Sequence, residues 1–252
     1  MRTSLWIATL AVAATVTDSL TAQRGRWRRP DEVWQRVGVF FSAIKGPATD
    51  GEKAAALETT ELVRAAAAAQ QPAVLYLVDG EADEEAVRTF ERALFRGDEL
   101  GIKLRCFHTG RLDVAKDAAL RARFGSQTPL FVVFDADGEA EKPLSMRGFK
   151  ADARELEKLL DRAAKGAVKP SLDAFAKRYA DFVRDFERVV AERETAERDR
   201  ERAGDDAGKR RKADKELAEL EREQQQLLEQ EQKLLERVRL PARGADARRD
   251  RK

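Results

Sequence analysis

One stretch of this chain, residues 123–138, restricts the possible architectures more than any other. It reads Arg-Phe-Gly-Ser-Gln-Thr-Pro-Leu-Phe-Val-Val-Phe-Asp-Ala-Asp-Gly. Gly125 predicts the end of a helix, Thr128-Pro129 predicts a turn, and the apolar run at 130–134 predicts a buried strand. The Asp-Ala-Asp-Gly that follows is typical of a turn after which the chain returns as a second strand. Strands joined in this way pair antiparallel, so a sheet that also contains parallel strands would be mixed.

Predicted helices and strands alternate on both sides of this stretch. Residues 73–78 form a continuous apolar run, which is typical of a strand buried on both faces. Capping residues, glycines and prolines delimit the remaining elements: we expect helices at 31–44, 52–69, 83–95, 113–124 and 151–164, and strands at 102–107 and 144–148. This order predicts an α/β fold in which helices flank a mixed sheet.

The C-terminal third of the chain has a different pattern. After Pro170, apolar residues recur with alternating spacings of three and four, which predicts a helical hairpin or coiled coil over residues 170–240. A glycine-bounded break at 204–208 divides it into two arms, and Gln224 and Glu231 occupy two positions of the otherwise apolar seam of the second arm. Polar residues at such positions weaken a seam or set its register. Residues 241–252 form a basic tail that we expect to be disordered.

The N-terminus has the features of an export signal. Arg2 precedes an apolar segment at 5–16, and Ala22 is a small residue suited to a cleavage point, so residues 1–22 are interpreted as a signal peptide. The apolar segment is short for a membrane span. We therefore expect an exported protein, periplasmic or extracellular, that contacts a membrane only if this segment is retained. Residues 23–65 are expected to form an N-terminal helical extension whose basic start, 23–30, is solvated.

Composition excludes several classes of function. The chain has 48 Lys and Arg against 46 Asp and Glu, so its net charge is only +2. This balance argues against a dedicated nucleic-acid-binding protein, in which one sign of charge dominates a face. One cysteine and one histidine exclude an intramolecular disulfide and leave no obvious ligand set for zinc. The sequence suggests no cofactor.

Residues 66–166 resemble the thioredoxin-like superfamily. The resemblance lies in Gln71-Pro72 before the entry strand, Phe124-Gly125 before a proline loop, Thr128-Pro129 before the apolar strand, and glycines in the returning hairpin. It implies that Pro129 follows a cis peptide bond. It also implies that the backbone of Gln127 and Thr128 faces an extended peptide, which would bind by β-augmentation. The alternative is a turn proline that serves folding alone.

The same resemblance places the family's two redox cysteines at Asp83 and Ala86, where this chain has no thiol. Asp83 is instead expected to cap the following helix, which is worth about 1 kcal/mol. Since neither side chain can exchange a disulfide, we expect no thioredoxin-type redox activity. Five carboxylates lie around this position: Asp79, Glu81, Asp83, Glu84 and Glu85. Such oxygens could bind calcium, but acidic residues are also expected at a helix start because they complement the helix dipole, and we favour this structural interpretation.

Cys106 and His108 lie on or beside the strand predicted at 102–107. We expect Cys106 to be a buried, unreactive thiol and His108 to be a polar residue at the end of a strand. The favoured function is therefore a redox-inactive binding or scaffold module that engages a protein partner, or a second copy, through the hairpin. A single-thiol or non-thiol enzyme on the same fold and a structural envelope protein that oligomerises through the coiled coil are the alternatives.

Overall fold

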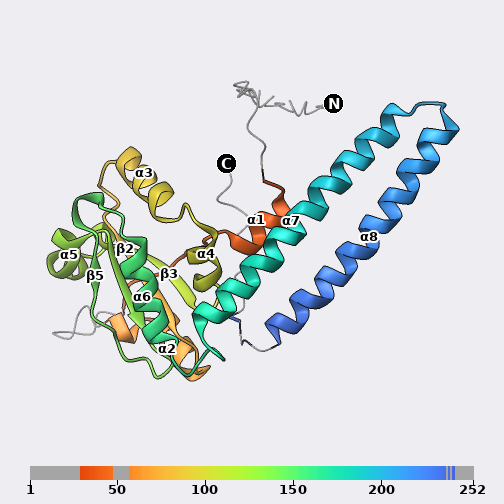
Figure 1. The fold of residues 1–252 in the computed structure, drawn as a ribbon. Helices are drawn as coiled ribbons and strands as arrows, with labels where there is room; N and C mark the ends of the chain where they lie inside the picture. The colour runs from red at the N-terminus through yellow and green to blue at the C-terminus, as the bar shows by residue number, and fades with distance from the viewer. Residues whose placement is uncertain (1–28, 48–56, 237, 239, 242–252) are drawn as a thin grey trace, which may run out of the picture.

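The computed structural model describes residues 29–47, 57–236, 238 and 240–241. The predicted signal peptide, most of the basic arm and nearly all of the basic tail lie outside these residues. Figure 1 shows a sheet domain followed by two long helices. The α-helices are α1 (Asp31–Val37), α2 (Glu61–Ala68), α3 (Glu84–Leu94), α4 (Asp98–Leu104), α5 (Ala118–Phe124), α6 (Ala153–Ala163), α7 (Leu172–Arg202) and α8 (Ala207–Leu235). The strands are β1 (Ser42–Ala43), β2 (Ala73–Val78), β3 (His108–Asp113), β4 (Leu130–Phe134) and β5 (Leu144–Ser145).

The five strands form one mixed sheet in the order β1-β3-β2-β4-β5. The pairs β1–β3 and β2–β3 are parallel, whereas β2–β4 and β4–β5 are antiparallel. The predicted α/β class, with a mixed sheet and a hairpin that returns after the Asp-Ala-Asp-Gly turn, is confirmed. Within the described residues, no helix has the length and apolar character needed to cross a membrane.

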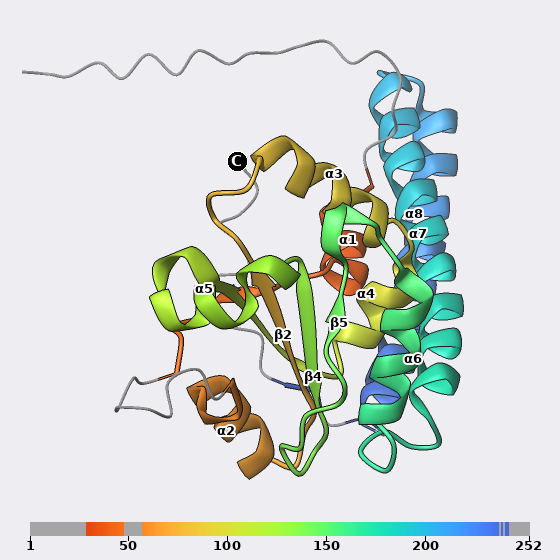
Figure 2. The same ribbon diagram turned by 90° about the vertical axis from the view of Figure 1, so that its left-hand side faces the viewer.

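Helices cover both faces of the sheet (Figure 2). Every residue of β2 is buried, as its continuous apolar run predicts. Val74 and Tyr76 face the layer that contains α3, α4 and α6, whereas Leu75 and Leu77 face the layer of α2 and α5. The first layer is continuous with the apolar residues of α7, so the hairpin shares the core of the domain.

The helical hairpin is also confirmed. Ser171 caps α7 by accepting a hydrogen bond from the Ala174 amide at 3.2 Å, and Asp206 caps α8 through the Lys209 amide at 3.0 Å. Gly204, with a φ of 52°, lies in the turn between the two helices. The buried seam and docking residues of α7 are Leu172, Phe175, Ala176, Tyr179, Phe182, Val183, Phe186, Val189, Val190 and Ala196.

The strand predicted at 102–107 is wrong. Residues up to Leu104 belong to α4, and the strand is β3, which begins at His108. The alternating Ile102, Leu104 and Cys106 imitate the period of a strand because α4 is enclosed: all its residues from Leu100 to Leu104 are buried, including Gly101 and Lys103. A helix surrounded by protein has no polar face to reveal its period.

The helix predicted at 31–44 is half wrong. It ends at Val37, because Gly38 adopts an extended conformation with φ −62° and ψ 143°. The chain then runs to β1, where Ser42 and Ala43 pair with Gly110 and Arg111 of β3. The 23–65 extension predicted to be helical therefore supplies an edge strand of the sheet.

Three other predicted boundaries also move. The helix predicted at 113–124 begins at Ala118, because Asp113 ends β3 and Asp117 is the cap of α5. The helix predicted at 52–69 is α2, which begins after its cap Thr60; residues 52–56 lie outside the described part of the chain. The strand predicted at 144–148 is confined to β5, since residues 147–149 form a short 3-10 helix.

Candidate functional site

The residues that the sequence singles out as a possible peptide site emerge at one end of the sheet. In the strand register, Leu77 lies opposite Leu130 of β4, and Val78 lies opposite Asp113 of β3. Because β2 and β3 end where β4 begins, the loop after Val78, the start of α3 and the Thr128-Pro129 turn all leave the sheet at this end.

Asp83 occupies the capping position of α3. Its carboxylate accepts a hydrogen bond from the Glu85 amide at 3.1 Å, so the predicted N-cap is confirmed. Ala86 lies in the first turn and is half-buried. Neither side chain carries a thiol, so this helix start can stabilise the fold but cannot perform thiol chemistry.

The neighbouring carboxylates are used in turns and ion pairs. Asp113 accepts hydrogen bonds from the amides of Gly80 at 2.8 Å and Ala115 at 3.1 Å. Asp79 accepts from the Glu81 amide at 3.0 Å, and Glu81 pairs with Arg121 at 2.5 Å. No set of three or more potential metal ligands comes together in the described part of the chain. These contacts agree with the structural interpretation of the acidic residues.

The proline loop has the predicted cis peptide bond between Thr128 and Pro129. Its backbone is partly committed to the fold: the Gln127 carbonyl oxygen accepts from the Ser145 hydroxyl at 2.6 Å, and the Pro129 carbonyl oxygen accepts from the Met146 amide at 2.7 Å. The Thr128 amide donates to the Gly125 carbonyl oxygen at 3.4 Å. Among the described residues, the Thr128 carbonyl oxygen accepts no hydrogen bond from the backbone, in contrast to those of Gln127 and Pro129.

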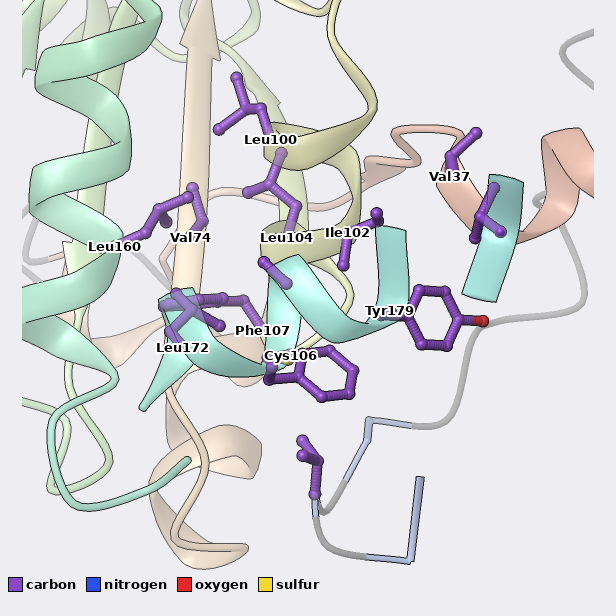
Figure 3. Packing of buried hydrophobic residues seen from close by; sticks show 14 of the residues in the cluster. Val37, Val74, Leu100, Ile102, Leu104, Cys106, Phe107, Leu160, Leu172 and Tyr179 are labelled. Atoms are coloured by element: carbon purple, nitrogen blue, oxygen red, sulfur yellow. The ribbon is translucent and has the colours of Figure 1, made fainter. Parts of the chain in front are cut away.

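Cys106 and His108 are not part of this end of the sheet. Cys106 lies in the turn after α4 and is 1% exposed, surrounded by apolar side chains (Figure 3). Burial raises the pKa of its thiol to about 12 despite the adjacent Arg105, which lowers it. The predicted burial is thus confirmed, although the predicted strand is not. His108 begins β3 and contacts the Gln71 side chain at 2.7 Å, and burial lowers its pKa.

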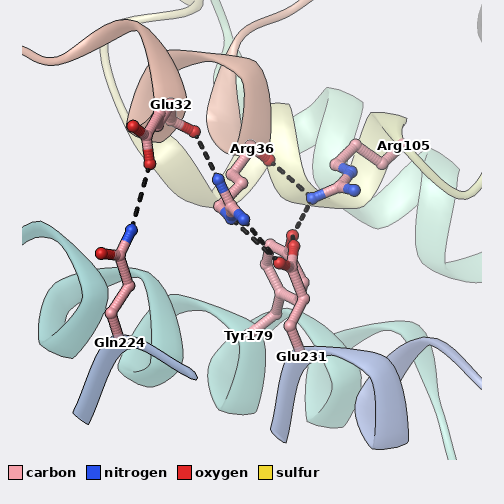
Figure 4. Close-up of polar contacts among 6 residues, drawn as sticks. All are labelled: Glu32, Arg36, Arg105, Tyr179, Gln224 and Glu231. Carbon is pink, nitrogen blue, oxygen red and sulfur yellow. Dashed lines mark hydrogen bonds and ion pairs between the residues drawn. The ribbon is translucent and has the colours of Figure 1, made fainter. Parts of the chain in front are cut away.

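The most elaborate polar arrangement lies where the hairpin meets the domain (Figure 4). Arg36 of α1 donates to the Glu231 carboxylate through Nε at 3.0 Å and Nη2 at 2.8 Å. Tyr179 also donates to Glu231, and Arg105 donates both to the Tyr179 hydroxyl and to the Arg36 carbonyl oxygen at 3.0 Å. The guanidinium of Arg36 stacks on the ring of Phe186 at 4.0 Å. This network joins α1, α4, α7 and α8.

The two polar seam positions of α8 both reach α1. Glu231 pairs with Arg36, and the Gln224 amide donates to Glu32 at 3.4 Å. Polar residues at seam positions were expected to weaken the hairpin or set its register, and here they connect it to a third helix.

A second polar cluster surrounds Lys103, whose side chain is only 2% exposed. Its ammonium group pairs with Asp161 of α6 at 3.2 Å and with Asp173 in the first turn of α7. Burial alone would lower the pKa of Lys103, but its hydrogen bond to Asp173 and the charge of Asp161 raise it on balance. Glu157 lies in the same region, and burial raises its pKa.

A third cluster involves Arg29, just before α1. It binds Asp98 through two hydrogen bonds of 2.6 and 2.8 Å and also binds Glu187 of α7 at 2.6 Å. The hydrogen bond to Asp98 is the main reason that its pKa is raised. Arg29 therefore differs from the solvated side chain expected of the basic arm.

Sequence reasoning missed Arg29, Arg36, Lys103 and Arg105 as docking residues. The one available signal was Glu231 on an apolar seam, which implied a buried cationic partner without identifying it. In the comparisons with known proteins, no family model and no curated protein matches this chain.

Proposed function

We propose that this chain is an exported, redox-inactive thioredoxin-like protein that acts as a binding or scaffold module, with its helical hairpin as the principal binding element. The observation that carries the proposal is the fixed attachment of the hairpin. Three polar clusters, centred on Arg29, Arg36 and Lys103, hold α7 and α8 on the domain, and both helices then continue past it.

The arrangement of strands, helix and proline at one end of the sheet supports the thioredoxin-like assignment. A parallel β2–β3 pair, an antiparallel β4, a helix that starts just after β2 and a cis Pro129 before β4 form the combination that the sequence resemblance implies. A shared fold does not imply a shared activity, so function is argued from the residues at the site.

Loss of redox chemistry is supported by the residues that stand at the expected thiol positions. Asp83 and Ala86 cannot form a disulfide, and the single thiol of the chain, Cys106, is buried with a raised pKa. A thiol in that state is a poor nucleophile at neutral pH, because only the thiolate attacks. This also speaks against the alternative of a single-thiol enzyme.

The hairpin is built to keep a fixed orientation to the domain. The contacts on α7 extend from Asp173 to Glu187, and the aromatic residues between them are buried in the shared core. Since several contacts spread over more than three helical turns resist both rotation and tilting, the hairpin would present a partner at a defined position relative to the proline loop.

Two measurements test the proposal. Insulin reduction by the pure protein should remain at background, whereas the double variant Asp83→Cys, Ala86→Cys should form a redox-active pair if the helix start has the inferred thioredoxin-like geometry. Robust insulin reduction by the unmodified protein would contradict the redox-inactive part of the proposal. Failure of the double variant to oxidise would count against the family assignment.

The binding role is tested by photo-crosslinking in the native exported fraction. A crosslinking residue at the exposed Ala218 of α8 should capture a defined partner, and the same residue at Lys150 on the domain is the control. A matched deletion of residues 196–202 and 207–213 removes one heptad from each helix and so preserves the seam register. This shortened protein should fold normally and lose the crosslink; capture that is unaffected by the deletion would contradict the role of the hairpin.

Oligomerisation through the hairpin, as in a structural envelope protein, is less well supported. Among the described residues, Trp34 of α1 is the only large apolar side chain that is exposed, so the hairpin presents no apolar face for self-association. Measurement of the mass in solution for the full chain and the shortened protein distinguishes the two functions: a partner-binding module predicts the same oligomeric state for both.

A further inference from the structure

We infer that the far end of the hairpin carries a basic docking face for an acidic protein partner. The face consists of Lys209, Arg210, Arg211, Lys212 and Lys215 in the first turns of α8, all of them exposed. This inference rests on the proposed function and specifies the chemistry of the partner.

The positive charge of this face is poorly compensated. Residues 209–215 hold five cations and one carboxylate, Asp214, and that carboxylate pairs with Arg200 across the hairpin at 2.7 Å. Lys209 and Lys215 have only loose pairs on their own helix, at 3.4 and 3.8 Å. Arg210, Arg211 and Lys212 make no ion pair within the described part of the chain. Three cations are therefore available to carboxylates from outside.

The stability of the hairpin does not explain these residues. After its cap Asp206, α8 has no carboxylate in its first turn, whereas α7 begins with Asp173 and α3 with Glu84 and Glu85. Cations at a helix N-terminus oppose the helix dipole. Residues that are unfavourable for local structure and have no compensating local contact commonly lie at functional sites.

The basic face lies at the far end of the hairpin, where a partner can reach it. The last ion pair between α7 and the rest of the domain is Arg29–Glu187, and α7 continues for fifteen residues to Arg202. At 1.5 Å per residue, the tip lies about 22 Å farther along the helix. Val189 and Val190 are still buried in the first turn of this part, but between residues 196 and 213 the buried side chains are those of Ala196, Ala203 and Ala213. The last turns of the hairpin therefore extend the arm while they bury little apolar surface. Figure 1 shows this end of α7 and α8 standing clear of the sheet domain.

An acidic protein fits this face better than a lipid bilayer does. Elements that bind anionic bilayers combine cations with apolar side chains that insert, and the described part of the hairpin exposes no large apolar side chain. The tip also carries Glu201, Asp205 and Glu216, which an extended anionic surface would repel but a protein with a localised acidic patch can avoid.

The test measures binding of the full-length protein to a helical peptide made only of Glu and Ala, and separately to phosphatidylglycerol vesicles. The tip variant Lys209→Glu, Arg210→Glu, Arg211→Glu, Lys212→Glu should bind the peptide about tenfold more weakly or worse, since four favourable charge pairs become repulsive. It should be at least as resistant to denaturant as the unmodified protein, because Glu agrees with the helix dipole. Reduced binding therefore cannot be attributed to unfolding.

The matched control is Lys142→Glu, Arg147→Glu, Lys150→Glu, Arg154→Glu, which changes four exposed cations of the domain and gives the same net charge. Retained peptide binding by this control supports the inference, whereas equal losses in both variants would show a net-charge effect and overturn it. Preference for the vesicles over the peptide would also overturn it. If the tip variant still captures the Ala218 crosslinking partner, this inference fails while the proposed function stands; if the unmodified protein captures none, the proposed function itself fails.

Discussion

Replacement of Glu231 by Leu tests whether the hairpin is held by a buried charge pair. The substitution restores the apolar pattern of the α8 seam, so a sequence-based argument predicts a more stable coiled coil. The structure predicts the opposite. Glu231 accepts two hydrogen bonds from Arg36 and one from Tyr179, and its side chain is only 12% exposed.

The expected cost follows from what is left behind. Removal of one partner of a buried ion pair costs about 3–5 kcal/mol. Arg36 is 16% exposed and keeps its hydrogen bond to the Glu32 carbonyl oxygen and its stacking on Phe186, so the low end of that range applies. The new Leu regains about 1 kcal/mol by burial of apolar surface. The free energy of unfolding should therefore fall by about 2 kcal/mol.

Denaturant unfolding followed by far-ultraviolet circular dichroism measures this change through the shift of the midpoint at constant slope. The double variant Arg36→Met, Glu231→Leu removes both charges and should lie within about 1 kcal/mol of the unmodified protein. Because Glu231→Leu alone costs about 2 kcal/mol, a double-mutant cycle completed with Arg36→Met should give a coupling energy of at least about 1 kcal/mol. The control Glu229→Leu, at an exposed position of α8, should change stability by no more than about 0.5 kcal/mol. A stabilising Glu231→Leu, or a coupling energy close to zero, would refute the reasoning.

Three further predictions concern the other sites. Burial raises the pKa of Glu157 above its ordinary 4.5. A group whose pKa is raised in the folded state contributes stability that is present below pH 4.5 and is lost as pH rises through the folded-state value. Glu157→Gln should therefore be more stable than the unmodified protein near neutral pH, and its free energy of unfolding should depend less on pH above 4.5. If Glu157→Gln instead lowers the denaturant midpoint of unfolding at neutral pH, the conclusion that the charged form of Glu157 is unfavourable in the folded protein is wrong. Cys106 should react with a thiol reagent only slowly in native buffer and within the mixing time after denaturation, and rapid native labelling would show that the thiol is accessible. Asp83→Ala should lower the free energy of unfolding by about 1 kcal/mol through loss of the α3 cap, whereas Asp83→Asn, which can still accept from the Glu85 amide, should have a much smaller effect in the same unfolding assay.

The features that could be predicted from the sequence are those with a local physical cause. The apolar run at 73–78 and the run at 130–134 after Pro129 identify buried strands whatever surrounds them. Asp83 identifies a helix start, because its carboxylate caps amides only two or three residues away. The hairpin follows from its seam and from the glycine-bounded turn at 204–208. The apolar neighbours of Cys106 likewise indicated a buried thiol, whereas the cis bond before Pro129 was expected only from the family resemblance.

The candidate site was anticipated less completely. The sequence placed the proline loop and the helix start, and strand register then showed that they share one end of the sheet. The commitment of the Gln127 carbonyl oxygen to Ser145 was not predictable, because those residues are 18 positions apart. Such a contact depends on how β5 returns along β4.

Residues 102–113 show what only the tertiary structure decided. Ile102, Leu104 and Cys106 alternate like a strand, yet this segment ends a helix, and the more polar residues from His108 to Asp113 form a central strand. The outcome depends on β1 and β2, which pair with β3 on both sides, and on α7, which encloses α4. Likewise, Arg36 and Glu231 are 195 residues apart, and they form an ion pair only because α1 lies against the hairpin. Local pattern determined the two apolar strands, the capped helix starts and the hairpin, whereas the packing of distant segments determined the structure of residues 102–113, which polar groups are buried and how the hairpin is held.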